Sequence, residues 1–349
     1  MRQPWISSAA LVLVVALGNE PVLAQTPPKT FSLGNAVRAG WFHMRLTGGR
    51  IVVTGARVGN MSPHPTTVGG TVEKITIRNV NGNAVVTYQM TSPEEQLSFE
   101  LGPADRVVLR REGQKDPAGT QVLYEQVPGG PVVLTVGPPA RQEVYKAATL
   151  WHLLLAQPQA ARQHLLPLLD LLRPEWKLRD AADSLENELV RLARAGELPD
   201  RRRWDGWIGQ LADDSFAVRQ AADRELRRLG PGVRSYLEHL DLRRLDAEQQ
   251  SRVRRILQAL SSRSADDAPE QVATWLATDP WTWHALLDRP SLADRQLAAA
   301  QLAALLGEPL AFDPSADEAT RRKQADQVRA RIEAKYPRVA PREDTPGAK

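Results

Sequence analysis

The sequence contains no cysteine among its 349 residues. This absence excludes disulfide bonds, thiolate metal sites, a cysteine nucleophile and the lipid-bearing cysteine of a lipoprotein. The six histidines show no His-Glu-x-x-His motif or other close metal-ligand spacing. Gly-x-Ser-x-Gly elbows and glycine-rich phosphate-binding loops are missing as well. The sequence therefore predicts no metal ion, no cofactor and no recognisable catalytic centre.

Apolar runs are short after the first 24 residues, so we expect no transmembrane segment in the mature chain. The 45 basic and 41 acidic residues are well mixed and leave a formal net charge of only +4. Such a surface is not by itself a polyanion-binding signature. Arginine clusters recur in the second half, but acidic residues are interleaved with them, so we expect solvated helix faces and no nucleic-acid partner.

The beginning of the chain is typical of a secretory signal peptide. Arg2 supplies a positive charge, and Ile6 to Leu17 form an apolar stretch too short to cross a bilayer comfortably. We expect cleavage after Ala24, which leaves Gln25 as the new N-terminus. The alternative is an uncleaved membrane anchor. Export to the periplasm or the extracellular space is the preferred prediction.

From about Phe31 to Val136 the apolar residues alternate with polar ones, as in strands that bury one face. Asn81-Gly82 lies between two such runs and favours a type I′ hairpin turn. Five further strands are expected at Trp41–Leu46, Ile51–Thr54, Arg106–Arg110, Thr120–Gln126 and Pro131–Val136. We expect the segment Gly59–Gly70 to be a loop. The pattern predicts an antiparallel β-sandwich or partial barrel.

After Gly137 the apolar period changes to that of helices, which continue to about residue 336. The predicted organisation is α+β with two domains. It comprises a signal peptide (1–24), a β-rich domain (25–139), an all-α domain (140–336) and a disordered tail (337–349).

One helical segment carries a distinctive pattern. An aspartate-containing turn precedes a Val-Arg pair, which is followed by alanines, leucines and a glycine. The residues concerned are Trp207, Asp213, Val218, Arg219, Ala222, Leu226 and Leu229. This segment resembles the second helix of a HEAT repeat. Alanines would allow close helix packing, and the arginine could pair with an acidic turn residue or cap carbonyls.

A partial echo of this pattern occurs later in the chain. Aligning Arg219 with Arg295 places Ala298, Leu302 and Leu305 at the alanine and leucine positions. The resemblance covers roughly Trp204 to Leu306. In many families such repeats are scaffolds for protein interactions.

Nine tryptophans are present, and the helical half includes Trp204, Trp207, Trp275, Trp281 and Trp283. Most are expected to fill seams between helices, as Trp207 fits the buried face of the repeat. Trp281 and Trp283 are two residues apart on one helix, so both cannot easily face the same core. One of the two is the best candidate for an exposed partner contact.

Three functions are compatible with these features. The leading hypothesis is an exported, non-enzymatic scaffold that binds a protein or peptide through its helical surface. In that hypothesis, strand addition at an exposed edge of the β domain is a second recognition mode. The alternative is an envelope-glycan or matrix-binding module that uses the β domain. A hydrolase comes third and requires carboxylates or histidines from distant segments to converge. The sequence leaves the oligomeric state open.

Overall fold

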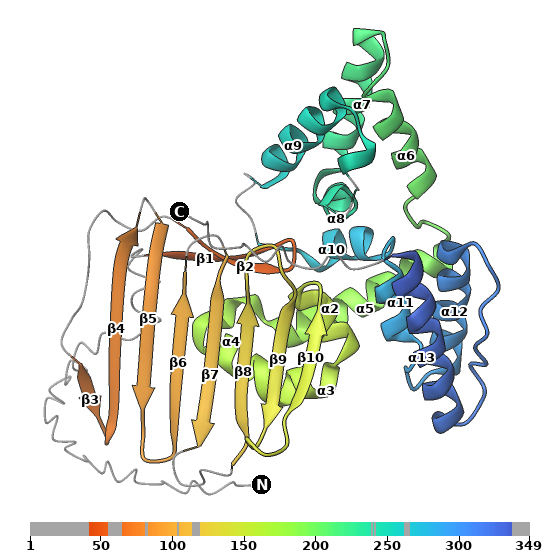
Figure 1. Ribbon diagram of the computed structural model, residues 1–349. Coiled ribbons are helices and arrows are strands. Elements are labelled where there is room, and N and C mark those ends of the chain that lie inside the picture. The colour runs from red at the N-terminus through yellow and green to blue at the C-terminus, as the bar shows by residue number, and fades with distance from the viewer. Residues whose placement is uncertain are drawn as a thin grey trace, which may run out of the picture. The chain divides into compact units, whose positions relative to one another are not determined.

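The computed structural model (Figure 1) describes residues 42–54, 65–80, 83–102, 105–113, 119–238, 240, 242–261 and 266–336. The predicted signal peptide and the predicted C-terminal tail lie outside the described residues. An N-terminal antiparallel sheet is followed by a helical region, which confirms the predicted α+β, two-domain fold class. Within the described residues, no helix combines the length and the apolar character that a membrane span requires.

The main sheet has eight strands, and each one pairs with its neighbours in sequence. The strands are β3 (Thr66–Val68), β4 (Thr71–Val80), β5 (Asn83–Thr91), β6 (Glu95–Leu101), β7 (Val107–Gly113), β8 (Gln121–Gln126), β9 (Val132–Gly137) and β10 (Glu143–Ala147). All pairs are antiparallel, with β3 and β10 at the two edges. The sheet is an open meander and does not close into a barrel.

The register explains why one face of this sheet is buried. Ile75 lies opposite Tyr88, Tyr88 opposite Phe99, and Phe99 opposite Leu109, so the apolar residues form a continuous row across four strands. The Tyr88 and Phe99 rings stack with their centroids 5.4 Å apart. The alternation read from the sequence therefore defines the inner face of the sheet.

Two sequence predictions need correction at the ends of the sheet. The segment predicted as a loop contains β3, which pairs with β4 after the Gly69-Gly70 turn. The sheet also continues beyond the predicted boundary at residue 139, because β10 pairs with β9. The predicted hairpin is present as β4 and β5, although its Asn81-Gly82 turn lies outside the described residues.

A separate hairpin packs on the inner face of the sheet. It consists of β1 (His43–Thr47) and β2 (Arg50–Thr54), joined by the Gly48-Gly49 turn. The fully buried Gln126 of β8 lies on the inner face and bonds both the amide and the carbonyl of Ile51. These bonds pair the backbone amide and carbonyl of Ile51, which would otherwise be buried without hydrogen-bond partners.

The helical region begins with short elements and continues with longer ones. It contains α2 (Leu150–Ala156), α3 (Pro158–Ala160), the π-helix η1 (Ala161–Leu165), α4 (Leu166–Leu172), η2 (Pro174–Trp176), α5 (Leu178–Ala195), α6 (Arg201–Gln210), α7 (Phe216–Arg228), η3 (Gly230–Val233), α8 (Arg234–Glu238), η4 (Leu242–Arg244), α9 (Ala247–Ser261), α10 (Pro269–Leu276), α11 (Pro280–Leu286), α12 (Leu292–Leu306) and α13 (Glu318–Lys335). In Figure 1, α2 and α4 lie behind the sheet.

The buried side chains form two clusters that do not divide at residue 139. The larger cluster contains the inner face of the sheet, α2 to α5 and α10 to α13. The smaller cluster is confined to residues 204–260 and includes Trp204, Leu226 and Ile256. Helix α5 packs directly against α10. The segment from α6 to α9 is therefore inserted between two helices of the main core and has a smaller core of its own. We call residues 201–261 the α6–α9 module.

Candidate functional site

Polar or exposed side chains gather in three places: at the turn of the β1–β2 hairpin, on β6, β7 and β10 near the π-helix η1, and on the surface of the α6–α9 module. At the turn, Gly48 and Gly49 both have positive φ, and their amides donate to the carboxylate of Asp267 at 2.8 and 2.7 Å. The indole Nε1 of Trp151 donates to the same carboxylate at 2.8 Å. Burial raises the pKa of Asp267, while these donors oppose the increase.

The neighbouring Asp266 strengthens the same junction. Its carboxylate accepts the amide of Leu46 at 2.7 Å and lies 3.6 Å from the Arg173 guanidinium. Arg173 also donates to the carbonyl of Met44. Every carboxylate bond described here joins two parts of the chain, so the pair Asp266-Asp267 holds the segment before α10 against the hairpin.

A hydroxyl, an imidazole and a carboxylate are linked beside this turn. Thr149 Oγ1 lies 2.8 Å from His152 Nδ1, and His152 Nε2 lies 3.0 Å from Asp279 Oδ2. A nucleophilic triad needs a hydroxyl that a substrate can reach. Here Thr149 caps α2, Asp279 caps α11 and His152 is buried. The linked groups therefore join two helix N-termini.

A cluster of polar side chains lies on β6, β7 and β10, near the π-helix η1. Arg111 Nε bonds Glu95 at 2.7 Å, and the Tyr145 hydroxyl donates to Glu143. The pKa of His164, in the π-helix, is lowered mainly by burial and next by Arg111, while Glu143 opposes the decrease. Among the described residues, no three His, Asp or Glu side chains are arranged to hold a metal ion.

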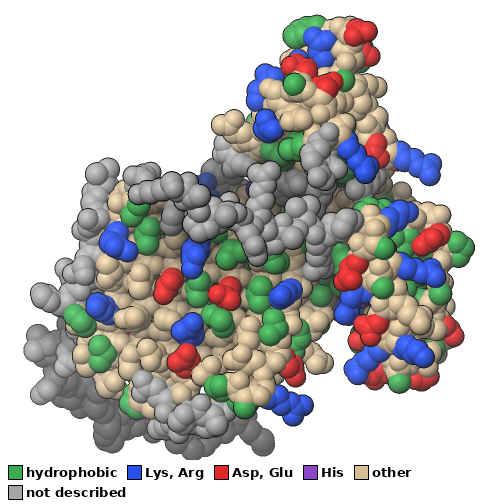
Figure 2. Space-filling model, viewed as in Figure 1, with side chains coloured by type: hydrophobic (Ala, Val, Ile, Leu, Met, Phe, Trp, Pro, Cys, Tyr) green, Lys and Arg blue, Asp and Glu red, His purple; other side chains and the backbone are tan. Residues whose placement is uncertain are grey.

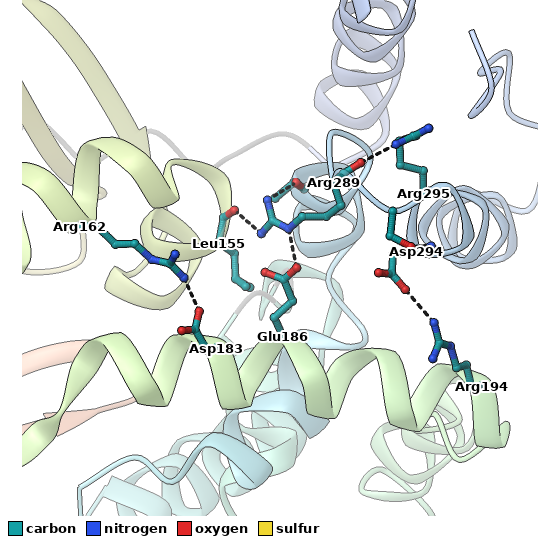
Figure 3. A network of polar contacts seen from close by, with 10 residues as sticks. Leu155, Arg162, Asp183, Glu186, Arg194, Arg289, Asp294 and Arg295 are labelled. Carbon is teal, nitrogen blue, oxygen red and sulfur yellow. Dashed lines mark hydrogen bonds and ion pairs between the residues drawn. The ribbon is translucent and has the colours of Figure 1, made fainter. Parts of the chain in front are cut away.

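A network of arginine contacts joins the helices of the main core (Figure 3). Arg289 Nε bonds Glu186 of α5 at 2.6 Å, and Arg289 Nη2 donates to the Leu155 carbonyl at 2.9 Å. Arg194 at the end of α5 bonds Asp294 of α12 at 2.8 Å. The network is structural, because its acceptors are carbonyls and carboxylates of adjacent helices.

The two arginines that the sequence aligned have the same role. Arg219 Nη1 donates to the carbonyls of Asp213 and Asp214 at 2.6 and 2.9 Å. Arg295 Nη1 donates to those of Arg289 and Pro290 at 2.7 and 2.8 Å. Each arginine thus bonds the carbonyls six and five residues before it, in the turn that precedes its helix.

The other aligned positions also correspond. Ala222 and Ala298 are buried, as are Leu226 and Leu302, whereas Leu229 and Leu305 are half-buried. Val218, beside Arg219, is half-buried too. The two aligned helices belong to different cores, however, since α7 packs in the smaller cluster and α12 in the larger one.

Two further copies of the cap were missed by sequence analysis. Arg321 of α13 donates to the carbonyl of Ala316 at 2.6 Å, and Gln250 of α9 donates to that of Leu245 at 3.0 Å. Both acceptors lie five residues before the donor. Helix α13 does not repeat the alanine and leucine positions of α7 and α12. The one sequence signal for its cap is Arg321, four residues after the N-cap Asp317.

The structure separates the predicted tryptophan contacts. Trp283 is fully buried and its Nε1 donates to the Ala277 carbonyl at 2.8 Å, which removes it from the two candidate contacts. Trp281 is half-buried and lies with its ring 6.0 Å from that of His284. Of these two tryptophans, only Trp281 has exposed surface that a partner could contact. A spacing of two residues turns one ring inward and leaves the other near the surface.

The surface of the α6–α9 module carries apolar and cationic groups together. Phe216, the first residue of α7, is 64% exposed. On α6, the exposed guanidinium of Arg203 lies 4.8 Å from the ring centroid of the half-buried Trp207. Aromatic and arginine side chains are enriched at protein interfaces. This surface is therefore the candidate interaction site.

The outward face of the sheet has a different character. Its rows contain residues such as Thr87, Glu100, Val108 and Glu125. In the described strands β4 to β10, none of the outward-facing positions carries an aromatic ring. Sugar binding by ring stacking therefore has no platform on that part of the face.

Comparison with known proteins gives no relative: no family model, no curated protein and no solved structure matches the chain.

Proposed function

We propose that the chain is an exported, non-enzymatic interaction protein that binds a protein or peptide partner through its helical region. The observation that carries the proposal is the α6–α9 module, which has a hydrophobic core of its own and exposes Phe216 on its surface. A module with its own core can present a binding surface without disturbing the main core. The HEAT-like pattern and the repeated helix caps agree with a helical-repeat scaffold.

The proposed contact combines three side chains. Phe216 would insert into an apolar pocket of the partner, where burial of an aromatic side chain contributes about 2 kcal/mol or more. The stacked pair Arg203–Trp207 supplies a rigid cationic and aromatic group on the adjacent helix of the module. Trp281, on α11, is a secondary candidate because it belongs to the other core.

Site-specific photo-crosslinking on the full chain tests this proposal. Phe216 is replaced by benzoylphenylalanine, and the chain is expressed in an exporting bacterial host and irradiated in envelope fractions. Leu171 is 53% exposed on α4 and gives a matched control position outside the module. A defined polypeptide crosslinked at position 216, absent at position 171 and competed by excess unlabelled chain, would support the proposal.

The same experiment can contradict it. Equal adducts at both positions, or no polypeptide adduct at position 216, would remove the module as a binding surface. A second variant, Phe216→Ser, measures how much the Phe216 side chain contributes to partner binding. Because Phe216 is exposed, we expect the substitution to change the free energy of unfolding by no more than about 0.5 kcal/mol. We expect this variant to weaken partner binding by at least about tenfold.

A further inference from the structure

The charges of α7 and α9 are strongly unbalanced. The two helices together contain seven arginines, no lysine and three acidic residues. Their excess of four positive charges equals the formal net charge of the whole chain, +4. The remainder of the chain is therefore formally neutral, and the positive charge is concentrated on these helices.

The acidic residues of this pair of helices are already engaged. Asp223 pairs with Arg227, Glu225 with Arg228 at 3.1 Å, and Glu248 with Arg252 at 2.6 Å. These are the internal ion pairs expected of a solvated helix face. They account for three of the seven arginines.

A fourth arginine, Arg219, caps the turn before α7. The other three, Arg224, Arg254 and Arg255, are exposed. Arg254 donates to Gln250 at 3.1 Å and Arg255 to Ser251 at 3.5 Å, so their side chains lie along α9 against neutral groups. In the part of the chain that the structure describes, none of the three pairs with a carboxylate.

Helices α7 and α9 pack against each other as one layer. Ala222 and Leu226 of α7 are buried in the same cluster as Val253 and Ile256 of α9. The exposed arginines are therefore carried by a single rigid element. Figure 2 shows blue Lys and Arg side chains along the margin of the module beside α9, with both signs of charge at its tip.

We infer that the layer formed by the two helices α7 (Phe216–Arg228) and α9 (Ala247–Ser261) binds an acidic segment of a protein partner. This inference deepens the function proposed above and depends on it. Guanidinium groups pair bidentately with carboxylates, and this layer uses arginine alone. The interleaved Asp223, Glu225 and Glu248 would repel a continuous row of phosphates more than a peptide with spaced carboxylates. Phe216 begins the same layer and calls for an apolar counterpart, which a peptide side chain supplies.

Charge reversal on the full chain tests this inference. The variant Arg254→Glu/Arg255→Glu is compared with Arg179→Glu/Lys323→Glu, which changes the net charge equally at exposed positions on α5 and α13. The probe is a fluorescent peptide in which glutamates alternate with leucine and tryptophan. Three further probes serve as comparisons: the same peptide with glutamine in place of glutamate, a single-stranded oligonucleotide, and phosphatidylglycerol vesicles.

We expect the acidic peptide to bind the wild-type chain, and the glutamine peptide to bind at least about tenfold more weakly. Reversal on α9 should weaken the acidic peptide by about tenfold, while the control variant keeps wild-type affinity. Equal losses in both variants, tighter binding of the oligonucleotide or the vesicles, or no binding of the acidic peptide would overturn the inference.

The crosslink at position 216 separates the two proposals. If a polypeptide is still captured there with undiminished yield in the Arg254→Glu/Arg255→Glu variant, the protein is an interaction protein but its partner is not held by these arginines. If the capture fails in the wild-type chain as well, the proposed function itself is wrong.

Discussion

Trp151 and Asp267 are 116 residues apart in the sequence, and the indole Nε1 of the first donates to the carboxylate of the second at 2.8 Å. The amides of Gly48 and Gly49 donate to the same carboxylate. The β1–β2 turn, the first turn of α2 and the segment before α10 therefore meet at one side chain. A part-buried acceptor shared by three donors is a position where single substitutions have large and specific effects.

Replacing Asp267 by alanine should destabilise the fold. Three part-buried hydrogen bonds would lose their acceptor, and the expected decrease in the free energy of unfolding is about 3 kcal/mol. Urea denaturation followed by tryptophan emission measures the change. Asp214→Ala, at an exposed turn position, is the control and should stay within about 0.5 kcal/mol of wild type. Similar values for the two variants would show that Asp267 does not hold the junction.

Stability should also depend on the protonation of Asp267. Because burial raises its pKa above the ordinary value of 3.8, the folded chain binds this proton more tightly than the unfolded chain. The resulting stabilisation is complete below pH 3.8 and is lost as the pH rises through the higher, folded pKa. Relative to Asp267→Asn, the wild-type chain should therefore lose free energy of unfolding as the pH rises.

Urea denaturation of both proteins between about pH 3.5 and 6 measures this difference. The asparagine variant keeps the size of the side chain and removes its titration, so the comparison isolates Asp267 from the other carboxylates. A wild-type chain that gains stability over the variant with rising pH would show that the three donors outweigh burial and lower the pKa.

The hairpin turn gives a prediction with a matched control. Gly49 and Gly307 both have φ of +70°. A Cβ on Gly49 would lie 2.6 Å from Thr149 Oγ1, whereas a Cβ on Gly307 would meet nothing within 4 Å. Gly307→Ala should cost about 1 kcal/mol for its left-handed backbone alone. Gly49→Ala should cost at least about 2 kcal/mol more, because the packing of the turn against α2 must shift.

Thermal and urea unfolding of the two alanine variants provide the comparison. If they lose the same stability, the approach of the turn to Thr149 imposes no constraint. This close approach joins segments 100 residues apart, so neither the Gly48-Gly49 pair nor Thr149 signals it in the sequence.

Local periodicity predicted much of this fold. Alternation placed Ile75, Tyr88 and Phe99 on one face, and the helical period placed Leu226 and Leu302 in cores. What periodicity could not supply is the partner of each buried face. The assignment of α7 and α12 to different cores depends on α5 packing against α10, which is a tertiary choice.

The candidate site was only partly accessible to sequence analysis. Trp281 and Trp283 were correctly judged to face differently, but only packing decides that Trp283 is the buried one. Phe216 lies within the segment that resembles a HEAT repeat, and sequence analysis did not identify it as an exposed residue. Its position at the first turn of α7, outside the apolar stripe formed by Ala222 and Leu226, is the signal that could have identified it.

The repeated arginine cap leads to the last prediction. Arg295 donates to three carbonyls, since its Nε also bonds Pro314 at 2.8 Å, whereas Arg219 donates to two. Arg295→Ala should therefore lower the free energy of unfolding by about 3 kcal/mol and Arg219→Ala by about half as much. Arg322→Ala, at an exposed position on α13, should change it by less than about 0.5 kcal/mol.

Arg295→Lys distinguishes a cap from a simple positive charge. A lysine ammonium keeps the charge but lacks the planar fork that reaches Arg289, Pro290 and Pro314 together, so it should recover less than half of the lost stability. Urea denaturation of the four variants and wild type at one pH provides the measurement. Full recovery by lysine would mean that electrostatic attraction to the turn, and not the geometry of the three bonds, is what this arginine contributes.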